Sequence, residues 1–281
     1  MALRGRKPEK VEKRLKALFY GMAGVGKTTA AIQFPKPYLI DTEKGAENDQ
    51  YVEILKEKEG AIFSTTDFFE LIEEVKALLT TKHDYKTLII DPLTVLYNTL
   101  LEQAEKKVGS EFGRHYGEAN KSVKHLLNLL LRLDMNVIIT SHSKNEYGQG
   151  MIVLGQTFDC YKKLDYLFDI VFEIQKRGKE RVGVVKKTRI ETFGDGETFP
   201  FSYEEIAKRY GKKVLEKKAS IELLATKEEV IEVKRLIELL KIPEDNYQKW
   251  LNKASAESFD EMKSDDIQKC INHLKSQVTG E

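Results

Sequence analysis

The sequence predicts an α/β fold: a mainly parallel sheet with helices on both faces, followed by a small C-terminal all-helical appendage. Over the first half of the chain, unbroken apolar runs of strand length alternate with segments of helical periodicity, which is typical of a parallel sheet buried on both sides. After Leu224 the strand-like runs stop, and apolar residues recur only at helical spacing. A chain of 281 residues, 41% of them hydrophobic, is long enough for one large domain and such an appendage.

The early strands and helices follow from these runs in order. Continuous apolar runs place buried strands at residues 16–20, 38–41, 87–91 and 136–140. Apolar residues at helical spacing place helices at residues 27–34, 67–79 and 119–133. Pro35 ends the first of these helices, because proline has no N–H to continue the hydrogen-bond ladder.

The second half of the chain contains two further kinds of segment, first strands and then helices. Residues 169–175 and 181–190 alternate like strands of an antiparallel extension of the sheet. Further on, Thr226 and Glu229 form a capping box at the start of a helix, which ends before Pro243. Ser264 is expected to be the N-cap of another helix. We therefore divide the chain into a basic tail (residues 1–14), an α/β core (residues 15–215) and a helical domain (residues 225–281).

Bulk charge does not indicate a nucleic-acid binder, because 46 Lys and Arg are balanced by 45 Asp and Glu. The positive charges are nevertheless clustered locally. Residues 1–16 carry seven basic and two acidic side chains, and residues 176–189 carry seven basic and one acidic. The N-terminal cluster is interpreted either as an arm that touches DNA or as an ordinary solvated segment.

The chain shows no sign of a membrane or secretory destination. It has no run of about 18 apolar residues, so no membrane span and no membrane partner are expected. Its basic N-terminus is not followed by the apolar stretch of a secretory signal. The two cysteines, Cys160 and Cys270, are too few for a disulfide framework and are expected to be reduced thiols. These features predict a cytoplasmic protein.

The stretch GMAGVGKT, residues 21–28, has the spacing G-x-x-x-x-G-K-T between an apolar strand and a helix. Glycines allow a tight loop whose backbone N–H groups converge on phosphate oxygens. Lys27 would reach the β- and γ-phosphates, and the Thr28 hydroxyl would ligate Mg²⁺. ATP and Mg²⁺ are therefore the expected cofactors. The expected ATP-binding residues are Gly21, Met22, Ala23, Gly24, Val25, Gly26, Lys27, Thr28 and Thr29.

Two acids at strand ends complete the expected chemistry. Asp91 ends the strand TLIID and is expected to hold Mg²⁺ together with Thr28. ATP hydrolysis also needs a carboxylate that orients and polarises the attacking water, and the next residue, Pro92, offers none. Glu43, just beyond the strand YLID, is the candidate, with Asp41 as a supporting group. The alternative is that these acids only mark the turn that follows the strand.

Residues 15–210 resemble the ATPase core of RecA-like proteins. The resemblance rests on the phosphate loop and on the stretches LIDTE, VIITSHS and VVKKTR. It implies that Glu43 is the catalytic glutamate and that His142 takes the place of the γ-phosphate sensor, which is usually glutamine in this family. It also implies that Lys186 and Arg189 reach the ATP of a neighbouring subunit, with Lys187 on the opposite strand face.

The short spacing from phosphate loop to acid resembles that of phage RecA-like ATPases that act in single-strand annealing or recombination mediation. Such proteins bind single-stranded DNA through two loops, which would correspond to residues 106–117 and 143–155. Cations there would follow phosphates and rings would stack on unpaired bases. The alternative is two flexible, solvated loops. The candidate DNA-binding residues are Lys106, Lys107, Arg114, His115, Tyr116, Lys144 and Tyr147.

The resulting hypothesis is a Mg²⁺-dependent ATPase, stimulated by single-stranded DNA, that promotes phage DNA recombination or strand annealing. It would assemble as a homo-oligomer, either filament or ring, with ATP at the subunit interfaces, and would act in the host cytoplasm if phage-encoded. The C-terminal helices would bind a recombination or replication protein. The alternative is a DNA-independent regulatory or helicase-loader ATPase that acts on a protein partner. A small-molecule kinase and a GTPase are disfavoured, because the chain lacks an arginine-rich lid and an N-K-x-D motif.

Overall fold

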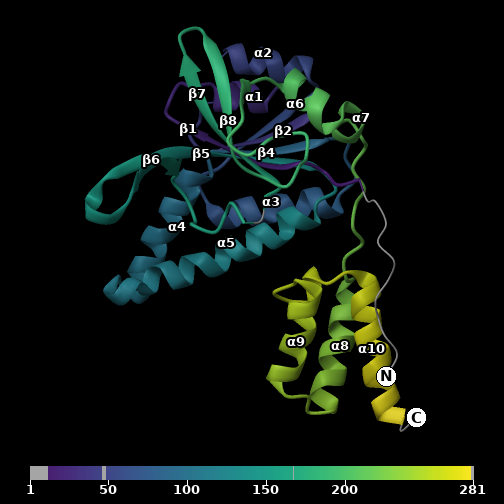
Figure 1. Ribbon diagram of the computed structural model, residues 1–281. Coiled ribbons are helices and arrows are strands. Elements are labelled where there is room, and N and C mark those ends of the chain that lie inside the picture. Colours follow the sequence, from purple (N-terminus) through teal and green to yellow (C-terminus); the bar gives the residue numbers. More distant parts are fainter. Residues whose placement is uncertain (1–11, 46–48, 167, 280–281) are drawn as a thin grey trace. The chain divides into compact units, whose positions relative to one another are not determined.

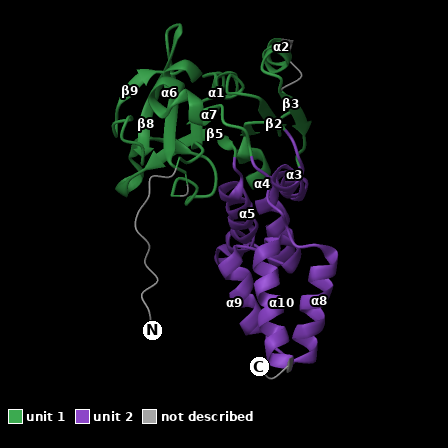
Figure 2. Ribbon diagram, turned by 90° about the vertical axis from the view of Figure 1, so that its right-hand side faces the viewer, with its two compact units in different colours: residues 1–66, 84–98, 135–219 green, residues 67–83, 99–134, 220–281 purple. Residues whose placement is uncertain are grey.

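The computed structural model describes residues 12–45, 49–166 and 168–279, so most of the expected basic tail lies outside the described residues. The chain forms two compact units, and each draws on separate stretches of sequence (Figure 2). The first unit contains the chain up to residue 66 and residues 84–98 and 135–219. The second unit contains residues 67–83, 99–134 and 220–281.

A mostly parallel sheet forms the centre of the first unit, in the strand order β3-β2-β4-β5-β1-β7-β8-β9 (Figure 1). The parallel strands are β1 (Lys16–Gly21), β2 (Pro37–Asp41), β3 (Ala61–Ser64), β4 (Thr87–Asp91), β5 (Asn136–Tyr147) and β7 (Ile170–Arg177). The antiparallel strands are β8 (Glu180–Thr188), β9 (Thr198–Pro200) and β6 (Val153–Phe158), which pairs with the outer part of β5. The predicted α/β fold class is therefore confirmed.

The strand register brings the ends of the parallel strands together at one edge of the sheet. Gly21 at the end of β1 lies opposite His142 in β5, and Asp41 at the end of β2 lies opposite Asp91 at the end of β4. Loops that follow parallel strands usually build the ligand site of such a sheet. Four stretches singled out in the sequence thus meet at this carboxyl edge.

Alternate residues of the central strands contribute to the hydrophobic core of the first unit. Phe19 of β1 and Phe172 of β7 pack with ring centroids 5.8 Å apart, and Phe201 lies edge-on to Phe19 at 5.0 Å. Rings in this geometry contribute beyond the area they bury. The helices of this unit are short: α1 (Lys27–Ala31), α2 (Asp49–Glu57), α6 (Tyr203–Tyr210) and α7 (Lys212–Leu215). Helix α4 (Leu93–Val108) begins in the first unit and continues into the second.

The second unit is helical and contains a core of its own. It consists of α3 (Phe68–Thr80), α5 (Arg114–Arg132), the later part of α4, and the C-terminal helices α8 (Lys227–Leu239), α9 (Glu244–Ala254) and α10 (Ser264–Thr279). The C-terminal helices bury their own cluster, which includes Val233, Leu236, Leu251, Ile267 and Leu274. The helical appendage expected from the sequence is present.

The C-terminal helices differ from the expectation in two details. The capping box of Thr226 and Glu229 forms as predicted. However, Pro243 also serves as the N-cap of α9, a helix that the sequence pattern did not reveal. Ser264 is the first residue of α10, and its hydroxyl donates to the Glu229 carboxylate at 2.9 Å. Glu229 therefore closes its own capping box and ties α8 to α10.

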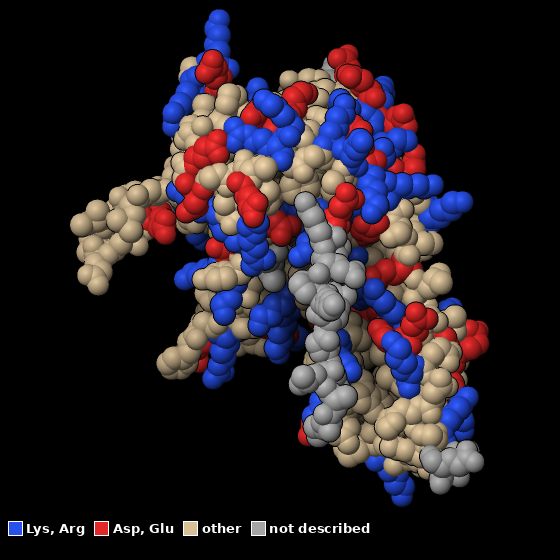
Figure 3. All heavy atoms as spheres, turned by 45° about the vertical axis from the view of Figure 1, so that its right-hand side comes forward, with Lys and Arg blue, Asp and Glu red and all other residues tan. Residues whose placement is uncertain are grey.

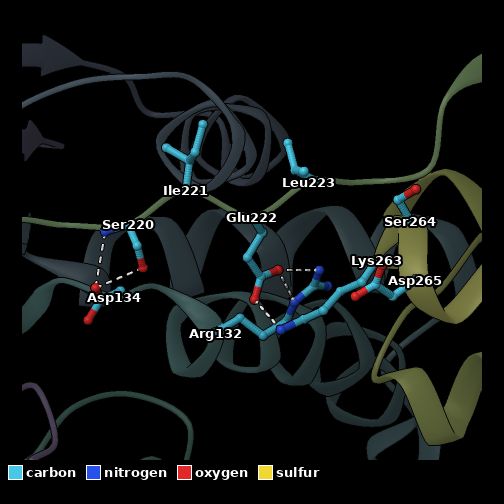
Figure 4. Close-up of a pocket in the computed structure, with 9 residues that line it drawn as sticks. All are labelled: Arg132, Asp134, Ser220, Ile221, Glu222, Leu223, Lys263, Ser264 and Asp265. Carbon is cyan, nitrogen blue, oxygen red and sulfur yellow. Dashed lines mark hydrogen bonds and ion pairs between the residues drawn. The ribbon is translucent and has the colours of Figure 1, made fainter.

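The segment that leads from α7 to the C-terminal helices is held by charged groups of the second unit (Figure 4). The Glu222 carboxylate accepts hydrogen bonds from Arg132 at 2.7 and 3.0 Å and pairs with Lys263 at 2.8 Å. Ser220 donates to Asp134 through both its N–H and its hydroxyl. These side chains line a cavity of about 360 Å³. None of the helices in the described part of the chain has the length and apolar character needed to cross a membrane.

Candidate nucleotide-binding site

The phosphate loop connects β1 to α1 at the carboxyl edge of the sheet. Gly26 has a φ of 93°, a left-handed conformation that favours glycine. A Cβ on Gly21 would lie 2.4 Å from the Ile174 carbonyl oxygen, so only glycine fits this close approach. The Lys27 ammonium donates to the carbonyl oxygens of Gly21 and Met22, each at 2.9 Å. The loop predicted from the sequence thus has the backbone conformation that its glycines require.

Lys27 is largely buried in this loop. Burial lowers its pKa, and the nearby charges of Asp91 and Glu43 oppose that shift. An ammonium group has three N–H donors, so two carbonyl oxygens occupy only part of its hydrogen-bonding capacity. Anionic phosphate oxygens are stronger acceptors for such a cation than neutral carbonyls.

Thr28 and Asp91 form a pair of oxygen donors below the loop. The Thr28 hydroxyl donates to Asp91 Oδ2 at 2.6 Å, and the Thr140 hydroxyl donates to Oδ1 of the same carboxylate. Burial raises the pKa of Asp91, while the hydrogen bonds from Thr140 and Thr28 oppose that shift. A hydroxyl and a carboxylate side by side fit Mg²⁺, which prefers oxygen ligands and usually takes the remainder from phosphates and water. The described residues contain no cluster of three acidic, His or Cys side chains that would hold a metal alone.

Glu43 and His142 meet at the same edge, with His142 Nε2 at 3.1 Å from Glu43 Oε1. Both side chains are about half exposed. The backbone N–H of Glu43 donates to Asp41 at 3.1 Å, and the Thr42 hydroxyl donates to the Pro92 carbonyl at 2.8 Å. The bond from Thr42 holds the end of β2 against the end of β4. The structure therefore brings together two residues that the sequence places about 100 positions apart.

The basic residues of β8 lie at different positions along the strand. Lys186 pairs with Glu173 at 3.4 Å, whereas the Lys187 ammonium donates to the carbonyls of Asp165 and Phe168. The Arg189 guanidinium donates to the Tyr166 carbonyl at 2.6 Å. The Arg189 backbone N–H bonds to Asp169, just before β7 begins. Arg189 thus lies at the amino end of the parallel strands, the edge opposite to the phosphate loop of its own chain.

The first expected DNA loop, residues 106–117, is mostly helical rather than irregular. Lys106 and Lys107 form the last turn of α4, and α5 begins with Arg114, His115 and Tyr116. Lysine and arginine are good helix formers, so the basic residues on both sides of the turn belong to helices. A short turn joins the helices, and it carries Phe112, whose surface is 99% exposed. Sequence reasoning did not single out this phenylalanine, although its glycine-flanked position was a signal.

The second expected DNA loop, residues 143–155, forms a hairpin instead. Strand β5 continues to Tyr147 and pairs with β6, and the hairpin projects from the sheet (Figure 1). Lys144 pairs with Asp159 at 2.9 Å, and Tyr147 is exposed. The hairpin tip also exposes four consecutive apolar residues, 151–154, which the emphasis on cations missed.

The fold and the loop at its carboxyl edge define a P-loop ATPase, in which nucleotide and typically Mg²⁺ bind beyond the ends of parallel strands. Residues 13–200 match a family model described as an AAA domain, and the chain belongs to that family. The crystal structure of the RadB recombinase is similar to this chain, with a TM-score of 0.45 and 21% sequence identity. That similarity covers 66% of this chain and 84% of the other. No curated protein matches the chain.

Proposed function

We propose that the protein is a RecA-like, Mg²⁺-dependent ATPase that oligomerises on single-stranded DNA and promotes phage DNA recombination or strand annealing. The observation that carries the proposal is the meeting of the phosphate loop, Asp91 and the Glu43–His142 pair at one edge of the sheet. A catalytic carboxylate beyond β2, rather than beside Asp91, matches the motif order on which the RecA-like resemblance rests. The proposed site of action is the cytoplasm, which is that of the host if the protein is phage-encoded.

Each residue of the site has a role in the proposed hydrolysis. The Lys27 ammonium exchanges its two carbonyl partners for β- and γ-phosphate oxygens when ATP enters. Thr28 and Asp91 would hold Mg²⁺, which when bound would supply positive charge to the phosphate oxygens. Glu43 accepts the proton of the attacking water, and His142 orients the Glu43 carboxylate by contacting it.

The proposed homo-oligomer, filament or ring, completes the site from a neighbouring subunit. Because Arg189 lies at the opposite edge from its own phosphate loop, it would act on the ATP of a neighbour. A guanidinium that reaches the phosphates in the transition state stabilises the developing charge. Lys186 is exposed enough to contribute a second positive charge across the same interface.

Two elements offer the chemistry that single-stranded DNA requires. The junction of α4 and α5 combines Lys106, Lys107 and Arg114 with the exposed rings of Phe112 and Tyr116. The β5–β6 hairpin combines Lys144 with Tyr147 and the apolar tip 151–154. Cations that follow phosphates and rings that stack on bases are the usual means of binding unpaired strands. His115, whose ring centroid lies 4.2 Å from that of Tyr116, belongs to the first of these surfaces.

The C-terminal helices are proposed to bind a recombination or replication protein. A groove of about 410 Å³ between α8 and α9 is lined in part by Ile237, Tyr247, Leu251 and Phe259. A partly apolar groove of this kind suits an amphipathic segment of a protein partner.

A second candidate function is a regulatory or helicase-loader ATPase that acts on a protein without DNA. The exposed apolar tip of the hairpin, residues 151–154, favours this candidate, because such patches often mark protein contacts.

Steady-state ATP hydrolysis, measured alone, with unstructured single-stranded DNA and with duplex DNA, separates the two candidates. The recombination proposal expects stimulation by the single strand and little by the duplex. Hydrolysis indifferent to both DNAs would favour the protein-directed ATPase, and the absence of hydrolysis under all conditions would overturn both candidates.

A further inference from the structure

The turn between β7 and β8 is basic and extends beyond the sheet on the side of the phosphate loop. Tyr20 in β1 lies opposite Glu173 in β7, so the rest of β7 runs past the end of β1. The Ile174 carbonyl lies against Gly21, the first glycine of the phosphate loop. The turn between β7 and β8 projects at the top of Figure 1, and Lys and Arg side chains project at the same height in Figure 3. The basic residues of the β7–β8 hairpin around this turn are Lys176 and Arg177 in β7, Lys179 in the turn and Arg181 in β8, and Glu180 is its acidic residue.

Arg181, in β8, is the residue of this hairpin that reaches the phosphate loop. A Cβ on Gly26 would lie 2.0 Å from Arg181 Nε, 2.8 Å from its Cδ and 2.9 Å from its Cζ. The guanidinium end of Arg181 therefore lies against the backbone of the residue that precedes Lys27. The Arg181 backbone carbonyl accepts a hydrogen bond from the Phe201 N–H, which anchors this part of β8.

The guanidinium of Arg181 is available to a ligand. The side chain is exposed, and within the described part of the chain no hydrogen bond or ion pair engages it. Arg177, on the other side of the turn, donates to Gln175 at 3.2 Å instead. A guanidinium presents several N–H donors in a planar fork that matches the oxygens of a phosphate group.

We infer that Arg181 contacts the phosphates of the nucleotide bound by its own chain. The inference deepens the proposed function, since it requires that the loop 21–28 binds ATP. Gly26 and Lys27 belong to the loop that would enclose the phosphates. Arg181 is the cation whose side chain lies against Gly26, on the side where a Cβ would be. Arg181 acts within the subunit, whereas Arg189, at the opposite edge of the sheet, acts on a neighbour. The segment made of β8 and Arg189, the residue that follows it, thus supplies a positive charge to two different nucleotide sites.

Nucleotide binding by the full-length protein tests the inference, with Arg181→Ala and Arg181→Lys as variants and Arg177→Ala as the matched control. The dissociation constant of a fluorescent ATP analogue is measured, and unlabelled ATP, inorganic tripolyphosphate and adenosine compete against it. Loss of a charge-assisted hydrogen bond predicts about ten-fold weaker binding of ATP and tripolyphosphate to Arg181→Ala. Arg181→Lys should retain part of the affinity, Arg177→Ala should change it less than about two-fold, and adenosine should be unaffected throughout.

Two results would overturn the inference while leaving the proposed function in place. Equal affinity of wild type and Arg181→Ala for ATP shows that Arg181 does not contact the nucleotide. A loss for adenosine equal to that for ATP assigns the contact to the base or ribose rather than to the phosphates. By contrast, a wild-type protein that binds no ATP, or a Lys27→Ala variant that binds as well as wild type, contradicts the proposed function itself.

Discussion

Glu43 is oriented from two directions. Its backbone N–H bonds to Asp41, and its carboxylate contacts His142 of β5. A carboxylate that is half exposed can still bind water, while its neighbours limit its motion. This combination of restraint and access is what a general base requires, and ordinary turn residues seldom have it.

Replacing Glu43 by Gln should keep ATP binding and reduce ATP turnover. The amide has nearly the shape of the carboxylate but cannot accept the proton of water, and loss of a general base typically costs about 10²–10⁴-fold in rate. Steady-state hydrolysis and the dissociation constant for ATP measure the two effects separately. Glu53→Gln, on the exposed face of α2, serves as the control and should leave both unchanged. Undiminished turnover in Glu43→Gln would remove Glu43 from the mechanism.

At the scale of elements, the turn between α4 and α5 exposes a ring that makes no packing contribution. Phe112 is 99% exposed, although burying a phenylalanine side chain would stabilise the fold by about 2 kcal/mol. The turn is flanked by Lys106 and Lys107 on one side and Arg114 on the other. An exposed ring among cations fits the proposed contact with unpaired bases.

Phe112→Ala should weaken the binding of single-stranded DNA without altering basal ATP turnover. Stacking of one base on an aromatic side chain contributes roughly 1–3 kcal/mol, which corresponds to about five- to 150-fold in affinity. Fluorescence anisotropy with a labelled single strand measures the affinity. Phe69→Ala, at another exposed phenylalanine, on α3, is the control. If both variants bind DNA as tightly as wild type, the α4–α5 turn is not a DNA contact.

Within the second unit, Glu261 joins three elements by charge. Its carboxylate contacts Lys76 of α3 at 2.7 Å and His125 of α5 at 3.2 Å. Burial by itself raises the pKa of Glu261, but the hydrogen bonds from His125 and Lys76 outweigh it and lower the pKa from 4.5 to about 2. A carboxyl group with a lowered pKa stabilises the folded state when ionised.

This cluster predicts acid-sensitive stability of the second unit. Its stabilisation, roughly 3 kcal/mol, is present above pH 4.5 and is lost as the pH falls toward 2, because the unfolded chain then binds the proton more readily. Urea unfolding of wild type and Glu261→Gln across this range measures it, with the exposed Glu238→Gln as control. The stability difference between wild type and Glu261→Gln should shrink as the pH falls. A difference that is constant with pH would show that Glu261 does not contribute through its charge.

At the scale of the whole molecule, the proposed role of Arg189 would make ATP hydrolysis depend on assembly of the subunits. Lys27→Ala cannot bind its own ATP but still presents Arg189, and Arg189→Ala has the opposite defect. In an equal mixture, roughly a quarter of the interfaces would join an intact phosphate loop to an intact Arg189, if subunits associate at random through a head-to-tail interface. The mixture should therefore hydrolyse ATP faster than the average of the two separate variants. Activity equal to that average would contradict a role for Arg189 in a neighbouring site.

The local parts of the proposed site depend on short motifs and can therefore be recognised in the sequence. The loop 21–28 and Asp91 follow buried strands, and the spacing of the motif alone indicates a bound phosphate. The same applies to the capping box of Thr226 and Glu229. The α/β class was equally accessible, since apolar runs that alternate with helical segments leave few other arrangements.

Other features depend on contacts between distant segments and were not visible in the sequence. The approach of Arg181 to Gly26 requires β7 to run past the end of β1, which depends on strand register rather than on any local pattern. Helix α9 was missed because Pro243 signals the end of a helix as well as a beginning. The expected loop at residues 143–155 forms paired strands, in which residues 143–147 continue β5 and pair with β6.

Helix α4 begins at Leu93, two residues after Asp91, and ends at Val108, beside the turn that carries Phe112. Sixteen helical residues span about 24 Å, so this one helix leads from the proposed magnesium-holding end of β4 to the turn of the proposed DNA contact. A tilt of about ten degrees at the start of the helix would move its far end by roughly 4 Å. Thermodynamic reciprocity then requires that a strand bound at the tip change the affinity for ATP by the same factor by which ATP changes the affinity for the strand.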